Sequence, residues 1–226
     1  MKFYHSNLLN SFDNITHAFT TKDSGNLAFH VNDNELHVIS NHELLAKKLG
    51  YEKNSLIHMK QIHSNIVHVV DENDIFEHPP TCDALITNKK NVALVTHYAD
   101  CVPIFILDTQ KSVIALAHGG WKGTALKIGA KVVRKMRADF DTNSRDCLIG
   151  IGPSIGRCCY EVDDYVINQF KKSYGDVTSF VQEKGSGKYD LDLWKANEIS
   201  LLEAGIPSEN ITISNMCTKC NNDIFY

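Results

Sequence analysis

Three segments of the sequence each place a metal-binding side chain beside an apolar run. They hold His63, Cys101 and His118, within the stretches QIH, ADCVP and AHGGW. Two imidazoles and a thiolate suit zinc, and three protein ligands leave a fourth position for water or substrate, as in catalytic zinc sites. The spacing is not a local motif such as HExxH. The structural alternative is a core cysteine with two hydrogen-bonded histidines at strand ends.

Glycines surround the third of these segments. Gly119, Gly120 and Gly123 flank Lys122, between an apolar run and a helix predicted over residues 125–140. Such a turn directs backbone N–H groups and a helix N-terminus toward the end of the strand. Together with the charge of Lys122, it predicts an anion site for phosphate. The stretch is not a Walker loop, because GxxxxGK[ST] is absent, and a tight packing turn is the alternative.

The cysteines near the C-terminus form a second possible metal or redox motif. Cys217 and Cys220 are spaced as CxxC. A structural zinc ion would need a second ligand pair, and the adjacent Cys158 and Cys159 are expected to have poor geometry for that role. A redox thiol pair is possible, although such a motif normally opens a helix after a strand. We therefore interpret these residues as ordinary thiols.

Two other cofactor classes are disfavoured by the residues themselves. The glycine-rich stretch 150–156 has the wrong spacing for a dinucleotide loop, and Pro153 stands where a donor N–H is needed. The eleven histidines suggest a copper oxidase, but no His-x-His pair occurs. His58, His63 and His68 are spaced by five, which alternates faces on a strand. A blue-copper or trinuclear centre is therefore poorly supported.

Short strands alternating with helices are expected to position these residues. Apolar or β-branched runs predict strands over residues 66–70, 84–87, 92–96, 104–107, 113–117, 148–151 and 211–214. Helices are predicted over 42–49, 125–140, from Asp163 or Asp164 through 174, and 192–204, with loops at 71–81 and 183–188. Run 113–117 is apolar on both faces, as in a strand covered on both sides. This order predicts a mixed α/β (α+β) fold in one domain over 1–226.

Composition narrows the class of partner. The 226 residues are 43% apolar, which can build a full core, and 23 basic residues face 27 acidic ones. That balance lacks the basic stripe of a nucleic-acid or membrane-surface protein, so the partner should be a small molecule. There is no signal-peptide h-region, and seven cysteines do not indicate a secreted disulfide framework. We expect a cytoplasmic protein.

The motifs, taken in order, strongly resemble the YfiH-like family, named laccase-domain or polyphenol oxidase proteins and regarded as purine nucleoside phosphorylases. The resemblance covers essentially the whole chain. It is carried by residues 60–63 (KQIH), 82–87 (CDALIT), 99–104 (ADCVPI), 118–123 (HGGWKG), 149–161 (IGIGPSIGRCCYE) and 191–206.

By this resemblance, His63, Cys101 and His118 match the family's zinc ligands one for one. The resemblance implies phosphorolysis of adenosine, inosine and methylthioadenosine, with adenosine deamination and a copper-dependent, laccase-like oxidation also attributed to the family. It also implies mixed sheets packed between helices, similar to the catalytic domain of cytotoxic necrotizing factor, with no second domain.

The chain departs from the family pattern at its expected anion sites. Lys122 replaces the usual Arg, Gly119 the usual Ala, and Lys22 lies where the family has Ser-Thr-Arg before a glycine pair. A lysine ammonium group is a point charge, whereas the arginine guanidinium it replaces is a planar fork of donors. We therefore predict a phosphate site at Lys22, Lys122, Gly119 and Gly120 with weaker or differently oriented binding. The Ser-Tyr-Arg-Arg-like tail that commonly follows the aromatic pair is also missing after Tyr226.

Each activity that the resemblance implies asks for further residues. Deamination needs a proton shuttle, for which Asp83 and Asp100 are the candidates, while phosphorolysis needs a positioned phosphate. Two rival functions from other classes remain, and a copper-dependent, laccase-like polyphenol oxidase is a third. One is a thiol hydrolase or deamidase with Cys101 as nucleophile and His118 as base. The other is a non-catalytic metal-binding or metabolite-binding protein.

Overall fold

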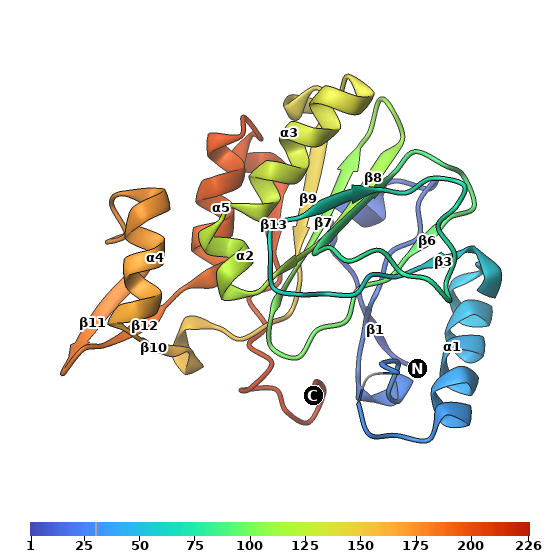
Figure 1. Cartoon of the computed structure of the whole chain (residues 1–226), viewed down its shortest axis with the longest axis horizontal. Helices are drawn as coiled ribbons and strands as arrows, with labels where there is room; N and C mark the ends of the chain where they lie inside the picture. The colour runs from blue at the N-terminus through green and yellow to red at the C-terminus, as the bar shows by residue number, and fades with distance from the viewer. Residues whose placement is uncertain (30) are drawn as a thin grey trace.

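A computed structural model of the chain describes residues 1–29 and 31–226, and its centre is a six-stranded mixed sheet (Figure 1). The strands are β4 (Val67–Val69), β5 (Ala84–Thr87), β7 (Val102–Asp108), β8 (Val113–Gly119), β9 (Cys147–Ile151) and β13 (Ile211–Ile213). Their order is β13-β9-β7-β8-β5-β4. The inner pairs are antiparallel, and the outer pairs β13–β9 and β4–β5 are parallel. Each of these strands overlaps one predicted from the sequence.

Helices cover one face of this sheet. They are α2 (Trp121–Ala125), α3 (Ile128–Phe140) and α5 (Leu193–Glu203) (Figure 1). Ile104 and Ile106 of β7 are buried in one cluster with Val132 and Met136 of α3. Fully burying such a side chain contributes about 1.5–3 kcal/mol relative to leaving it exposed. This packing joins the helices to the central sheet in one hydrophobic core.

The N-terminal segment covers the opposite face. It contains β1 (Phe3–Tyr4) and β2 (Phe19–Thr20), which pair antiparallel. Leu9 packs against Leu107 and Leu148, and the Phe19 ring meets Phe105 edge-on at 4.5 Å between centroids. The prediction that run 113–117 is covered on both sides is thus confirmed.

Two smaller units flank the sheet. One joins α1 (Glu35–Leu49) to the parallel pair β3 (Leu56–Ile57) and β6 (Ala93–Leu94). The other is an antiparallel sheet in the order β10-β12-β11, made of β10 (Glu161–Asp163), β11 (Val181–Gly185) and β12 (Lys188–Leu191), beside α4 (Asp164–Tyr174). The Asp163 side chain caps α4 by accepting a hydrogen bond from the Val166 N–H, as the sequence predicts.

Three predicted boundaries are wrong. The loop predicted at 183–188 is a hairpin, whose turn residues Ser186 and Gly187 have φ of 55° and 70°. The helix predicted over 125–140 is α3, which begins three residues later at Ile128, because Lys127 adopts a left-handed conformation and separates it from α2. The helix predicted from residue 42 begins at Glu35, because the Asn34 side chain caps it. These differences leave the predicted mixed α/β class confirmed, while the likeness to the toxin domain stays a prediction.

Within the part of the chain that the structure describes, no helix combines the length and the apolar character needed to cross a membrane.

Candidate metal centre

The three predicted ligands converge at one end of the central sheet. The His63 Nε2 atom lies 3.9 Å from the Cys101 Sγ atom, and the rings of His63 and His118 have centroids 4.8 Å apart at 77°. The donor atoms of the three residues all lie within 4.8 Å of one another. His118 is buried, Cys101 is half-buried and His63 is exposed. The site is therefore anchored in the core and open to solvent on one side.

Strand register brings these ligands together. In the β7–β8 pair Val102 is opposite Gly119 and Pro103 is opposite His118, so Cys101 lies just beyond the strand end beside His118. In the β5–β8 pair Ala84 is opposite Ala117. This register places Asp83 next to His118, and the His118 N–H donates to the Asp83 backbone carbonyl at 2.8 Å. His63 comes from the loop before β4.

The Asp83 carboxylate holds the two histidines. One oxygen accepts from His118 Nδ1 at 2.9 Å and from the His63 N–H at 3.0 Å. The other accepts from the Ser64 N–H at 2.7 Å and from the Ser64 hydroxyl at 2.6 Å. Burial raises the pKa of this fully buried acid, but the bonds from His118 and Ser64 outweigh that effect and lower the pKa to about 2. With Nδ1 of His118 donating to Asp83, its Nε2 is left to bind a metal.

Two of the turns that carry these residues have unusual backbone conformations. His63 has φ of 58° and Asp100, next to Cys101, has φ of 69°. Left-handed φ is uncommon outside glycine and persists where surrounding contacts fix it. Asp100 is fixed because its carbonyl accepts from the Ile155 N–H at 2.9 Å and its carboxylate accepts from the Thr218 hydroxyl.

Gly120 gives the ligands room. A Cβ atom at this position would lie 3.0 Å from His63 Cδ2 and 3.2 Å from Cys101 Sγ. Its neighbour Gly119 has a packing role, since an added Cβ there would lie 3.0 Å from the Val102 carbonyl oxygen. The glycine run that the sequence singled out thus allows the strand end and the helix start to meet close to the ligands.

The two lysines predicted to bind phosphate have different surroundings. Lys122 is exposed, with its amino group 5.6 Å from the centroid of the Trp121 ring. Burial lowers the pKa of His63, the charges of His118 and Lys122 lower it further, and the Asp83 carboxylate opposes them. The Lys22 amino group donates to the Asn222 carbonyl and lies 5.5 Å from the Tyr226 ring centroid. Lys22 therefore docks on the C-terminal segment.

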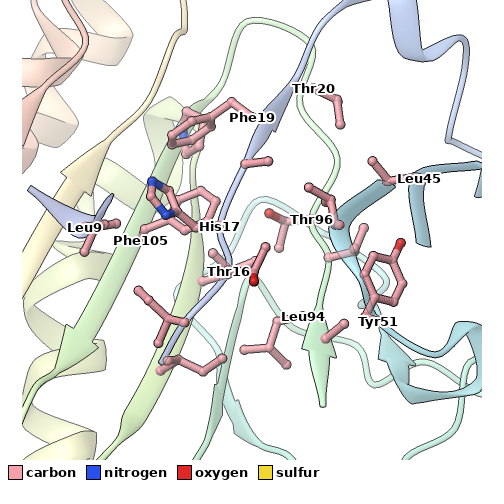
Figure 2. A pocket seen from close by; sticks show the side chains of 18 of the residues that line it. Leu9, Thr16, His17, Phe19, Thr20, Leu45, Tyr51, Leu94, Thr96 and Phe105 are labelled. Carbon is pink, nitrogen blue, oxygen red and sulfur yellow. The ribbon is translucent and has the colours of Figure 1, made fainter. Parts of the chain in front are cut away.

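A cavity of about 1090 Å³ lies next to the candidate metal centre, but none of the three ligands lines it. Figure 2 shows its wall, with Phe19 and Phe105 on one side and Leu45 and Tyr51 on the other. Asp100 also lines it, as do Tyr98, Lys22 and Thr218. No pattern in the sequence predicted this cavity, because the N-terminal segment that lines part of it forms strands of only two residues.

Comparisons with known proteins agree with the resemblance found in the sequence. A family described as multi-copper polyphenol oxidoreductase laccase matches residues 16–226. Purine nucleoside phosphorylase YlmD of Bacillus subtilis is 33% identical over 225 residues, covering 92% of this chain and 81% of that protein. Adenosine deaminase RL5, from an unknown prokaryotic organism, is 35% identical over 209 residues, covering 89% and 79%. The crystal structure of the hypothetical protein YfiH from Bacillus licheniformis superposes with a TM-score of 0.87 at 34% identity, covering 92% and 85%.

Proposed function

The chain belongs to the multi-copper polyphenol oxidoreductase laccase family, and from this membership we propose that it is a zinc-dependent purine nucleoside phosphorylase. Its substrates would be adenosine, inosine and methylthioadenosine, with deamination of adenosine as a second activity. The convergence of His63, Cys101 and His118 within 4.8 Å carries the proposal. The substrate class is supported by relatives named purine nucleoside phosphorylase and adenosine deaminase.

The residues fit a single zinc ion. Two imidazole nitrogens and one sulfur are a common zinc donor set, and three protein ligands leave a position for substrate or water. When bound, the ion would supply Lewis acidity toward an oxygen of the substrate or of water. Asp83 is saturated by donors and fully buried. We therefore assign it a positioning role, in preference to the proton transfer considered from the sequence.

Phosphorolysis breaks the bond between ribose C1′ and the purine nitrogen and forms a bond from C1′ to a phosphate oxygen. The electron pair leaves with the purine, which takes up a proton. Lys122 is the favoured phosphate ligand, because it is exposed and lies at the start of α2, four residues after His118. The Gly119 and Gly120 N–H groups remain proposed contacts, and Lys22 is the second candidate, since it lines the adjoining cavity.

Deamination replaces the purine amine by a water oxygen and releases ammonia. Asp100 is the better proton shuttle of the two sequence candidates, because it is half-buried, borders Cys101 and faces the cavity. The Thr218 hydroxyl donates to one of its carboxylate oxygens and fixes its orientation. We also propose a cytoplasmic location, where the seven free thiols would stay reduced.

The rival functions differ from this proposal in metal and in nucleophile. Among residues 1–29 and 31–226, the two clusters able to hold a metal contain two histidines with one cysteine, and four cysteines. Neither resembles the histidine-rich set of a multi-copper centre. A thiol hydrolase would use Cys101 as nucleophile, which a bound zinc ion would prevent because a ligating thiolate is not free to attack.

The test incubates metal-analysed protein with adenosine, inosine and methylthioadenosine, with and without phosphate. We expect the free base with ribose 1-phosphate (or its methylthio analogue) only when phosphate is present, and inosine from adenosine without it. His118→Ala should abolish both reactions, while His37→Ala, which alters an exposed histidine of α1, should not. Unchanged turnover in His118→Ala would contradict the site. Zinc binding without turnover of any nucleoside would instead favour the non-catalytic alternative.

A further inference from the structure

Four cysteines converge at a second point, away from His63, Cys101 and His118. The Cys220 Sγ atom lies 3.6 Å from that of Cys158 and 3.4 Å from that of Cys159. Cys217 completes the group, and all four sulfur atoms lie within 4.8 Å of one another. The expectation from the sequence that the adjacent Cys158 and Cys159 have poor geometry is therefore wrong. The 3-10 helix Arg157–Cys159 turns both side chains toward the CxxC segment.

These separations match a tetrahedral ion site better than a disulfide. A disulfide joins sulfurs at about 2.0 Å, and all seven cysteines of the chain are free. Four sulfurs placed about 2.3 Å from a central zinc ion lie about 3.8 Å apart at the corners of a tetrahedron. The distances from the Cys220 sulfur to those of Cys158 and Cys159, 3.6 Å and 3.4 Å, are slightly shorter than this value. Small side-chain adjustments would bring the four atoms to that geometry.

The surrounding backbone supports a set of thiolates. The Gly156 N–H donates to the Cys217 Sγ atom at 3.2 Å, a bond that favours a charged sulfur. A Cβ at Gly156 would lie 3.3 Å from the Cys158 Sγ atom, so the glycine keeps the loop close to the cluster. The Asn221 side chain and N–H both donate to the Cys217 carbonyl and close the CxxC turn. Such outer contacts orient ligands in metal sites.

We propose that Cys158, Cys159, Cys217 and Cys220 bind one structural zinc ion. Four protein ligands close the coordination shell, which is typical of structural and not of catalytic zinc. Cys158 and Cys220 are exposed, so the ion can enter from solvent. Binding would require four thiols to release their protons, with no change in oxidation state.

This ion would fasten the C-terminal segment to the loop that follows β9. Around it, the Thr218 N–H donates to the Ser154 carbonyl and the Ser154 N–H donates to the Met216 carbonyl. The C-terminal segment and the loop after β9 both also contact Asp100. Thr218 donates to it through its hydroxyl, and the loop donates to it through the Ile155 N–H. The four-cysteine site would therefore hold in place the turn that carries Cys101.

The test is the zinc content of the full-length chain purified with its thiols reduced, measured by elemental analysis. We expect about two zinc ions per chain, about one in Cys220→Ser, about one in His118→Ala and almost none in the double variant. Cys220→His should restore the second ion, because histidine is also a zinc ligand. Cys147→Ala, at a buried cysteine outside the cluster, should keep both.

The proposal would be overturned if Cys220→Ser bound as much zinc as the parent chain, or if the reduced parent lost all its zinc on His118→Ala. Intact mass under non-reducing conditions provides a second test that needs no variant. A loss of two hydrogens assigned to a disulfide among these cysteines, in zinc-replete protein, would also overturn it. None of these readouts depends on nucleoside turnover, so failure here and failure of the proposed enzyme activity are separable.

Discussion

Around His63, Cys101 and His118 the donor atoms are oriented by a buried carboxylate, whereas around the four cysteines they are oriented by backbone N–H groups and tight turns. The first cluster has three donors of two kinds, supplied by two strand ends and one loop. The second has four identical donors from a 3-10 helix and a CxxC turn. A mixed set of three can release one position to a substrate, while a uniform set of four can only hold the chain together. The two kinds of support should therefore fail in different ways.

The largest difference in zinc affinity between the two clusters should follow removal of the Asp83 charge. In Asp83→Asn an amide NH₂ replaces one carboxylate oxygen, so it faces groups of His63, Ser64 and His118 that are themselves donors. We expect zinc affinity at the first cluster to fall about 10–100-fold. Stability should fall by about 1–3 kcal/mol, because a buried donor loses its acceptor. Zinc titration and urea unfolding measure the two effects.

A matched control exists for that substitution. Asp74 accepts from His68 Nε2 at 2.8 Å, which is a histidine–carboxylate pair outside both clusters. Asp74→Asn should leave zinc binding unchanged. Equal loss of zinc in the two variants would mean that Asp83 does not support the ligands specifically.

Acid unfolding can be separated from metal loss through His17. Burial, together with the nearby charge of His5, lowers the pKa of His17 from its usual 6.5 to about 4. The unfolded chain then binds the proton more tightly. The stabilisation is therefore fully present above pH 6.5 and is lost as the pH falls toward 4, by at most about 3 kcal/mol.

His17→Gln removes this titration and keeps an acceptor for Ser6. We expect its stability, measured by urea unfolding across that pH range, to vary less with pH than that of the parent chain. His37→Gln, at an exposed site, should follow the parent curve. Parallel curves for His17→Gln and the parent would show that acid sensitivity arises elsewhere.

A pair of glycine substitutions tests whether the two clusters are independent. Gly120→Ala would place a Cβ 3.0 Å from His63 Cδ2 and 3.2 Å from Cys101 Sγ. Gly156→Ala would place one 3.0 Å from Trp194 Cη2, 3.1 Å from Cys217 Cβ and 3.3 Å from Cys158 Sγ. Neither glycine has positive φ, so crowding is the main change. Each variant should weaken zinc binding about tenfold at its own cluster, as for other substitutions that disturb ligand orientation. If either variant weakened zinc binding equally at the other cluster, the two clusters would not be independent.

The smallest effect should come from the contact that joins the two regions. Thr218→Val removes the hydroxyl that donates to Asp100 and should cost about 1 kcal/mol of stability with a modest loss of turnover. Thr142→Val is the control, because the buried Thr142 hydroxyl has no hydrogen-bond partner among the described residues. Denaturant unfolding should show no loss for this control. If Thr142→Val lost as much stability as Thr218→Val, the hydrogen bond from Thr218 to Asp100 would have no specific role in joining the two clusters.

The sequence predicted the central sheet well because its inner strands are buried on both faces. Runs such as residues 84–87 and 113–117 leave few alternatives to a covered strand, and both are strands in the structure. The hairpin at 181–191 was missed because β11 is largely exposed and polar, so its pattern is that of a loop. The two-residue strands of the N-terminal segment are too short to produce any period.

The candidate sites were predictable to different degrees. His63, Cys101 and His118 were proposed from their residue types beside apolar runs. Their spacing forms no local motif, so the family resemblance was needed to strengthen that prediction. The contact of Asp83 with both histidines depends on the register of β5 with β8, which the sequence does not specify. The four-cysteine cluster pairs residues more than 60 positions apart. Its signal was present as a Cys-Cys pair and a CxxC, but only the fold shows that they meet.

The left-handed backbone at His63 bears on how an ion would enter and leave. Because the His63 N–H is held by Asp83, the conformational entropy of this ligand is lost when the protein folds, and not when the ion arrives. A preorganised site of this kind loads without ordering a loop. Exchange of the ion should therefore be governed by ligand deprotonation and by dissociation of the ion, while the surrounding fold stays intact.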